Sequence, residues 1–194
     1  DKARMTTELS RLKEQAALRA VESVQSGMVL GLGSGSTATF AIRRIGQLLA
    51  DGRLTDLVGV PTSQVIADEA KRVGIPLTTL EAHPTMDLTI DGADEVDPDL
   101  NLIKGGGGAL LQEKIVATAS DRMVVIADVG KEVETLGAFP LPIEVIPFGW
   151  QTTQALVEET LVSVDVLGRE SSLRMNGATA FVTDEGNHIV DLHL

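Results

Sequence analysis

Short apolar segments alternate with helical segments through most of the first 130 residues. The apolar segments include 28–33, 56–60, 86–90 and 123–129. Between them, apolar residues recur at helical spacing over about 7–25, 38–52, 63–74 and 108–121. Such alternation favours parallel βαβ units with right-handed crossovers. The sequence therefore predicts an α/β fold, with a Rossmann-like, mostly parallel sheet flanked by helices.

The pattern changes near "FPLPIEVIPFGW", where three prolines punctuate an apolar segment. A helix is expected over 151–163, followed by short strands at 164–169, 171–175, 179–183 and 188–194, with a turn at 184–187. This pattern predicts a smaller α+β domain and is compatible with an antiparallel sheet in it. We expect a Rossmann-like catalytic domain over 1–145 and a small α+β domain over 146–194.

Charge and composition exclude several functional classes. The formal net charge is −12, from 16 Lys and Arg against 28 Asp and Glu, and such a surface disfavours a nucleic-acid partner. With no cysteine, disulfides, thiolate nucleophiles and zinc–thiolate sites are excluded. The apolar runs are too short to cross a bilayer. To bind an anionic ligand, such a chain would need several lysines close together at the site, because its net negative charge repels anions.

The segment "GLGSGSTA", Gly31–Ala38, joins a predicted strand to a predicted helix. Its small residues allow close approach of a ligand, and helix N-terminal amides with the Ser36 and Thr37 hydroxyls suit an anion. The segment lacks the lysine of a P-loop and misses the dinucleotide fingerprint. Two interpretations of this segment remain: a phosphate-binding loop, and a tight turn that only caps the helix.

The segment "IDGADEVDPD", Ile90–Asp99, follows a buried strand. Parallel sheets place ligand-binding groups at the carboxyl ends of their strands, where Asp91 and Asp94 could converge on a hydroxylated ligand. A solvated acidic loop is the alternative. An EF-hand does not fit the glycine spacing, and the three histidines lie outside these motifs, which argues against a transition-metal site.

Four glycines, Gly105–Gly108, separate Lys104 from a predicted helix. Their N–H groups could form an oxyanion or phosphate cradle, or the run could be only a flexible loop. In the helix, Glu113 has apolar neighbours three and four residues away on both sides. Burial among such neighbours raises the pKa of a carboxyl, which suits a general base. An exposed glutamate paired with lysine is the alternative.

A further motif, "ADVGKEVETLG", places Asp128 and Lys131 after another predicted strand. Alone, Lys131 is an ordinary surface lysine. In a parallel sheet, however, it falls on the same edge as the loops described above.

With these motifs in this order, the sequence resembles the ribose-5-phosphate isomerases of the A type. The resemblance covers nearly the whole chain, and the combination of DGADE and KGGGGAL followed by EKIV is highly specific. The matching segments are "GLGSGSTA", "PTS", "TIDGADEVD", "IKGGGGALLQEKIVA", "DVGKEVETLG", "FPLPIEVIPF" and "VTDEGNHIVD".

The resemblance implies an aldose–ketose isomerase that interconverts ribose 5-phosphate and ribulose 5-phosphate without a metal or cofactor, in the non-oxidative pentose phosphate pathway. It implies that Glu113 is the catalytic base, that Lys104 and Asp94 orient and stabilise the enediolate oxygens, and that Asp91 acts in sugar binding and ring opening. It also implies a cytoplasmic homodimer or homotetramer with no nucleic-acid or membrane partner. The substrate-binding residues that it implies are Ser34, Gly35, Ser36, Thr37, Gly92, Ala93, Gly105, Gly106, Gly107, Lys131 and Lys13.

Some positions depart from the family pattern. Ser34 stands where Thr is common, and Gln112 where many members have Arg. Family members also generally continue beyond "IVDLHL", so we expect either a trimmed chain or a naturally short form. Two alternatives stay open, a non-catalytic sugar-phosphate sensor and another enzyme of this fold group. An amino-sugar-phosphate isomerase would be expected to show a catalytic histidine, and these motifs contain none.

Overall fold

The computed structural model describes the backbone of residues 2–194 and the side chains from residue 8 onward. The chain divides into two compact units. The first comprises the residues up to Ala93 together with Leu111–Lys131, and the second comprises Asp94–Leu110 and Glu132–Leu194. The boundary expected near residue 145 differs from this division, because the strand that ends at Val145 pairs within the second unit.

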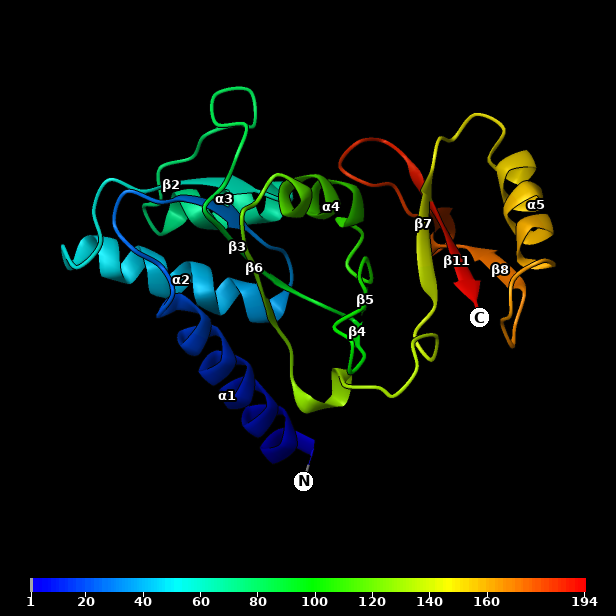
Figure 1. The fold of residues 1–194 in the computed structure, drawn as a ribbon, viewed down its shortest axis with the longest axis horizontal. Coiled ribbons are helices and arrows are strands. Elements are labelled where there is room, and N and C mark those ends of the chain that lie inside the picture. The colour runs from blue at the N-terminus through cyan, green and yellow to red at the C-terminus, as the bar shows by residue number, and fades with distance from the viewer. Residues whose placement is uncertain (1) are drawn as a thin grey trace. The chain divides into compact units, whose positions relative to one another are not determined.

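A parallel four-stranded sheet forms the centre of the first unit (Figure 1). Its order is β2-β1-β3-β6, and every neighbouring pair is parallel. The strands are β1 (Val29–Leu32), β2 (Val58–Pro61), β3 (Leu88–Gly92) and β6 (Met123–Ile126). The helices are α1 (Lys2–Val21), α2 (Ser36–Ala50), α3 (Gln64–Arg72), α4 (Leu110–Thr118) and the 3₁₀ turn η1 (Val129–Lys131). This arrangement confirms the predicted Rossmann-like α/β fold.

Alternate residues of the strands pack on opposite faces of this sheet. Leu30 and Ile90 join the main core with apolar residues of α1 and α2. The intervening residue Gly31 faces α4, since a β-carbon placed there would overlap the Thr89 hydroxyl and lie 2.6 Å from Val116 Cγ1. The missing side chain therefore lets α4 pack closely on its face of the sheet.

The second unit is mainly antiparallel, as the sequence predicts for the smaller domain. Its three-stranded sheet has the order β7-β11-β8, with β11 paired to both neighbours. Val145, Leu161, Val190 and Leu192 form its core. The elements are β4 (Glu95–Val96), β5 (Leu102–Ile103), β7 (Leu141–Val145), α5 (Trp150–Leu161), β8 (Glu170–Leu173), β9 (Met175–Asn176), β10 (Thr179–Ala180) and β11 (His188–His193).

Two of the predicted strands differ in the structure. Residues 164–169, predicted as a strand, form an irregular return from α5 to β8, with Leu167 fully exposed. At Gly168 a β-carbon would overlap the His193 carbonyl, so the backbone there packs against another segment. The strand expected at 179–183 is reduced to β10. Within the residues that the structure describes, no helix is both long and apolar enough to cross a membrane.

Candidate active site

Asp91 ties together two of the predicted motifs at the carboxyl edge of the parallel sheet. Its side chain is almost completely buried, with 1% of its surface exposed. One carboxylate oxygen, Oδ1, accepts hydrogen bonds from the Ser34 N–H at 3.1 Å and from the Gly92 N–H at 2.8 Å. Asp91 therefore fixes the backbone of the loop that follows β1, as expected if the two motifs serve one site.

The same loop is held from its other side by the residues that follow β2. The Ser34 hydroxyl lies 2.9 Å from both the Thr62 and the Ser63 hydroxyl oxygens. Thr62 is fully buried and donates to the Leu32 carbonyl at 2.8 Å, while Ser63 caps α3. Neither residue was among the predicted site residues, although the "PTS" segment at a strand end was a usable signal.

Lys13 is a residue of α1 whose side chain contacts the start of helix α2. Its amine donates to the Ser36 hydroxyl at 3.0 Å, although the two residues are 23 positions apart. Gly35, the N-cap residue, has φ of 100° and no side chain to cap the helix. An ammonium group therefore lies beside the uncapped amino end of a 15-residue helix, where the helix dipole also favours an anion.

Glu113 is buried on helix α4, with only 6% of its surface exposed. The same helix leaves Leu111 37% and Ile115 46% exposed. If apolar burial alone decided how this helix packs, Leu111 and Ile115 would be buried and Glu113 would be exposed. The exposed glutamate considered as an alternative is therefore wrong, and the burial of a carboxylate in place of available apolar residues is typical of a functional group.

Glu113 and Asp91 belong to the same layer of the first unit. Asp91 lies two residues after Thr89 on β3, so both side chains project to the face that Gly31 presents to α4. Helix α4 contributes Glu113 and also Val116, which packs against Gly31 on that face. The sequence expectation that one carboxylate comes from a strand end and another from the helix is compatible with this arrangement.

Lys131 ends the turn η1, which follows β6. This turn is closed locally, because the Asp128 carboxylate accepts from the Gly130 N–H at 3.0 Å and the Asp128 carbonyl accepts from the Lys131 N–H at 2.9 Å. In the sheet, Ile126 of β6 is the register partner of Gly92 in β3. Lys131 therefore lies beyond the same carboxyl edge as Ser34 and Asp91.

In the second unit, Asp94 holds the glycine run. Its Oδ2 atom accepts from the Gly106 N–H at 2.7 Å, and its own N–H donates to the Ile103 carbonyl at 2.8 Å. A β-carbon at Gly106 would lie 2.5 Å from Asp94 Oδ1 and 2.9 Å from Phe139 Cζ, so only glycine fits there. Lys104 lies between β5 and this run. Gly105, Gly106 and Gly108 therefore lie against other residues of the unit, whereas a β-carbon at Gly107 would meet nothing within 4 Å.

Glu95 is a buried carboxylate that the sequence did not single out. It is 3% exposed and accepts two backbone hydrogen bonds, from Gly137 at 2.8 Å and from Phe139 at 2.5 Å. It thereby fixes the segment that carries Phe139 over Gly106. Its position beside Asp94 in a run of acidic residues gave no signal to separate it from exposed neighbours.

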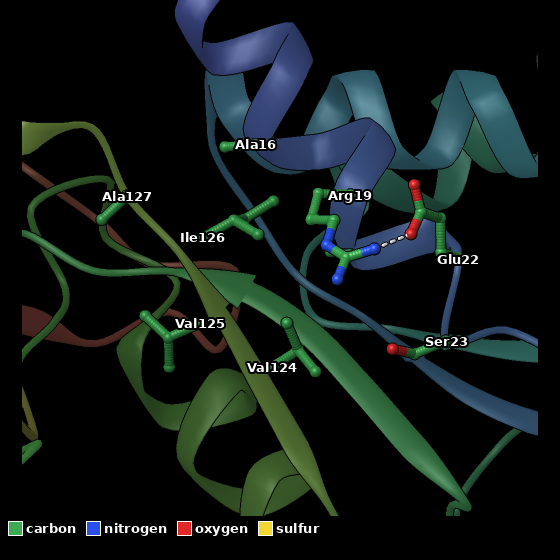
Figure 2. Close-up of a pocket in the computed structure, with 9 residues that line it drawn as sticks. Ala16, Arg19, Glu22, Ser23, Val124, Val125, Ile126 and Ala127 are labelled. Atoms are coloured by element: carbon green, nitrogen blue, oxygen red, sulfur yellow. Dashed lines mark hydrogen bonds and ion pairs between the residues drawn. The ribbon is translucent and has the colours of Figure 1, made fainter.

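The groove between α1 and the edge strand β6 contains none of the predicted site residues. It has a volume of about 510 Å³ and is lined by Ala16, Arg19, Ala20, Glu22, Ser23 and Val124–Ala127. Figure 2 shows Arg19 and Glu22 paired along the helix, on the other side of the groove from Val124. Among the described residues, no group of three or more His, Asp or Glu side chains is arranged to hold a metal ion.

The matching family model and the most similar curated relatives all point to the same protein family. The family model described as ribose 5-phosphate isomerase A (phosphoriboisomerase A) matches residues 58–194. A ribose-5-phosphate isomerase A of Ruegeria sp. (strain TM1040) is 67% identical over 186 residues, which cover 96% of this chain and 71% of the relative. That of Ruegeria pomeroyi is 65% identical, over 98% of this chain and 73% of the relative.

Solved structures agree with the sequence comparison. Ribose 5-phosphate isomerase from Plasmodium falciparum superposes with a TM-score of 0.87 at 42% identity, covering 95% of this chain and 79% of that one. A D-ribose-5-phosphate isomerase in complex with phospho-erythronic acid has the same TM-score and coverage at 40% identity.

The parallel α/β fold, taken with these relatives, identifies an enzyme of the isomerase class. More particularly, the chain belongs to the ribose-5-phosphate isomerase A family.

Proposed function

We propose that the chain interconverts D-ribose 5-phosphate and D-ribulose 5-phosphate, with Glu113 as the proton-transfer base. Family membership supports the reaction. The observation that carries the assignment of the base is the burial of Glu113 on a helix that exposes Leu111 and Ile115. A buried carboxylate is suited to abstract a weakly acidic C–H proton next to a carbonyl.

In this proposal, the carboxylate of Glu113 takes the proton from C2 of the open-chain aldose. The electron pair of that C–H bond forms the C1–C2 double bond of a cis-enediolate, and negative charge moves to O1. The same carboxyl returns the proton to C1, while a proton moves from O2 to O1 and C2 becomes the ketone. The developing charge on oxygen requires nearby donors. We assign the ammonium of Lys104 and the glycine amides to this task.

We also propose roles for Asp94 and Asp91, which their contacts support. Asp94 binds the Gly106 N–H, so its contribution to orienting the enediolate oxygens includes placing the glycine run itself. Asp91 fixes Ser34 and Gly92 by one oxygen. We propose that its carboxylate also accepts a sugar hydroxyl and assists ring opening, with Gly92 and Ala93 lining the sugar.

We assign the phosphate group to Lys13, Lys131 and the segment Ser34–Thr37. The uncapped amino end of α2, with Lys13 held 3.0 Å from Ser36, offers the donors that a phosphate monoester requires. Cations gathered at this site would let a chain of net charge −12 bind a dianion. We further propose a cytoplasmic homodimer or homotetramer that acts in the non-oxidative pentose phosphate pathway.

The proposal is tested by a coupled assay on ribose 5-phosphate, with and without EDTA. Glu113→Gln should lower kcat by about 10²- to 10⁴-fold, the usual contribution of a general base. Glu81→Gln, which alters an exposed carboxylate in the loop before β3, should leave kcat unchanged. Full activity of Glu113→Gln would show that Glu113 is not the base. Loss of wild-type activity with EDTA would contradict a metal-free reaction.

A binding measurement separates the enzyme from the sensor alternative. Phospho-erythronic acid, the ligand named for one structural relative, should compete with ribose 5-phosphate in this chain. Tight binding of ribose 5-phosphate by the wild-type chain without any turnover would favour a non-catalytic sensor.

A further inference from the structure

Arg174 is a partly buried arginine whose guanidinium is bound on several sides within the second unit. Its Nε and Nη2 atoms donate to the two carboxylate oxygens of Asp191 at 2.9 and 2.5 Å, and both side chains are about 15% exposed. The ring centroid of Phe181 lies 5.9 Å from the guanidinium carbon. The paired, planar geometry leaves Nη1 directed to another partner.

That partner is the glycine run. Arg174 Nη1 donates to the Gly105 carbonyl at 2.8 Å and to the Gly106 carbonyl at 3.2 Å, across 69 and 68 positions of sequence. The contact joins the turn after β8 to the loop that follows β5. A guanidinium that only needed a counterion would be satisfied by Asp191 alone.

A single peptide group is bound at both of its ends. The Gly105 carbonyl and the Gly106 N–H belong to the same peptide unit, which is trans, so they point in opposite directions. Arg174 binds the carbonyl and Asp94 Oδ2 accepts from the N–H at 2.7 Å. Glycine has no side chain to restrict its dihedral angles. The two charged groups, together with the Gly108 N–H that donates to the Gly105 carbonyl at 3.0 Å, therefore supply the orientation that the residue itself does not.

The next peptide group is set by the same arginine. Because Arg174 also binds the Gly106 carbonyl, the Gly107 N–H of the same trans peptide group points in the opposite direction, away from the guanidinium. At the end of the run, the φ of 85° at Gly108 and the Phe181 ring, which a β-carbon there would overlap, restrict the chain further.

We propose that Arg174, held by Asp191, is a positioning residue: together with Asp94 it fixes the Gly105–Gly106 peptide, and through the Gly106 carbonyl it orients the Gly107 amide for the sugar phosphate. This inference rests on the proposed function, in which those glycines bind substrate. Lysine cannot replace the arginine, because one ammonium cannot bind both carboxylate oxygens and two carbonyls in a fixed plane. Misplacement of such a loop by a fraction of an ångström reduces the rate without removing any group that touches substrate.

The test compares Arg174→Lys and Asp191→Asn with wild type in the ribose 5-phosphate assay. Each should lower kcat/KM by about 10- to 100-fold, with an unchanged far-ultraviolet spectrum. Arg169→Lys is the matched control. Arg169 is another arginine of the same unit whose Nε donates to a backbone carbonyl, that of Leu161 at 3.1 Å, so its replacement should leave kcat/KM within twofold.

Two readouts separate positioning from general destabilisation. In Arg174→Ala, added guanidinium ions should restore part of kcat/KM, whereas they should not restore Glu113→Gln. Amide hydrogen exchange at Gly106 should accelerate in Arg174→Lys, while exchange in β11 stays slow. A folded Arg174→Lys variant with kcat/KM within twofold of wild type, or with unchanged exchange at Gly106, would overturn the inference.

These outcomes are distinguishable from failure of the proposed function. If the wild-type chain does not turn over ribose 5-phosphate, the function fails and the positioning role for substrate fails with it. Exchange at Gly106 then still reports whether Arg174 and Asp94 hold the Gly105–Gly106 peptide. If Arg174→Lys does not fold, Asp191→Asn provides the same two measurements with the guanidinium retained.

Discussion

The amine of Lys13 lies 3.0 Å from the Ser36 hydroxyl, so a helix near the beginning of the chain contributes a cation to the first residue of α2. The family resemblance implied that both residues bind the substrate. Their contact shows that a cation and an uncapped helix end meet within one unit.

Replacement of Lys13 should therefore weaken substrate binding more than chemistry. We expect Lys13→Gln to raise KM for ribose 5-phosphate about tenfold with a small change in kcat, because a charge-assisted hydrogen bond to phosphate is lost. Raising the ionic strength should narrow the difference between variant and wild type. Lys71→Gln, at an exposed lysine of α3, is the control and should leave KM unchanged. A fall in kcat without a rise in KM would argue against a phosphate role.

The close approach of α4 to the sheet predicts a strong steric effect at Gly31. Gly31→Ala should lower the free energy of unfolding by about 1–3 kcal/mol, since the new methyl would overlap the Thr89 hydroxyl and crowd Val116. Urea denaturation of the single and double variants measures this. Combining Gly31→Ala with Thr89→Ala should cost less than the sum of the two changes. Strict additivity would mean that the helix moves away and the steric account is wrong.

The buried carboxylate of Glu95 should stabilise the segment around Gly137 and Phe139. We expect Glu95→Gln to cost about 1–3 kcal/mol, because the amide keeps only one acceptor oxygen for two backbone N–H groups. Hydrogen exchange at these two amides should accelerate more than at β11. Glu134→Gln alters an exposed glutamate of the same unit and should leave the exchange unchanged.

Acid should weaken the first unit through Glu69. Hydrogen bonds from Arg72 and Arg43 lower the pKa of Glu69 from its ordinary 4.5 to about 2. The folded-state pKa is depressed, so the stabilisation is present above pH 4.5 and is lost as the pH falls toward 2. Both arginine side chains are more than half exposed, which limits the contribution to about 1 kcal/mol.

Denaturation of Glu69→Gln and wild type across this range tests the assignment. The variant should be less stable at pH 6, and the difference should shrink between pH 4.5 and pH 2.5. Glu14→Gln, an exposed glutamate of α1, should show no such convergence. A difference that is independent of pH would indicate lost packing and not lost charge.

Much of the first unit was predictable because its signals are local. The spacing of apolar residues gives the parallel strands, and a parallel sheet gathers their carboxyl ends, which is why Ser34 and Asp91 were expected together. Glu113 could be chosen by its apolar helical neighbours. In each case the residues that define the pattern lie within a few positions of one another or at equivalent ends of strands.

Other features depend on partners far away in sequence. Glu95 was indistinguishable from the other acids of its segment, since the backbone groups that it accepts from lie 42 and 44 positions away. Arg174 meets Asp191 across 17 positions and Gly105 across 69. The strand predicted at 164–169 was wrong for a related reason, because alternating apolar residues form a strand only where a neighbouring strand is available.

The order of strands in the second unit has a consequence for synthesis on the ribosome. The first unit is complete once Lys131 has emerged, but β7 and β8 do not pair with each other and both require β11, the last strand of this sequence. Asp191 belongs to that strand. A nascent chain could thus carry Glu113 in folded surroundings well before its glycine run is fixed. Activity would then appear only after β11 has been synthesised and has paired with β7 and β8.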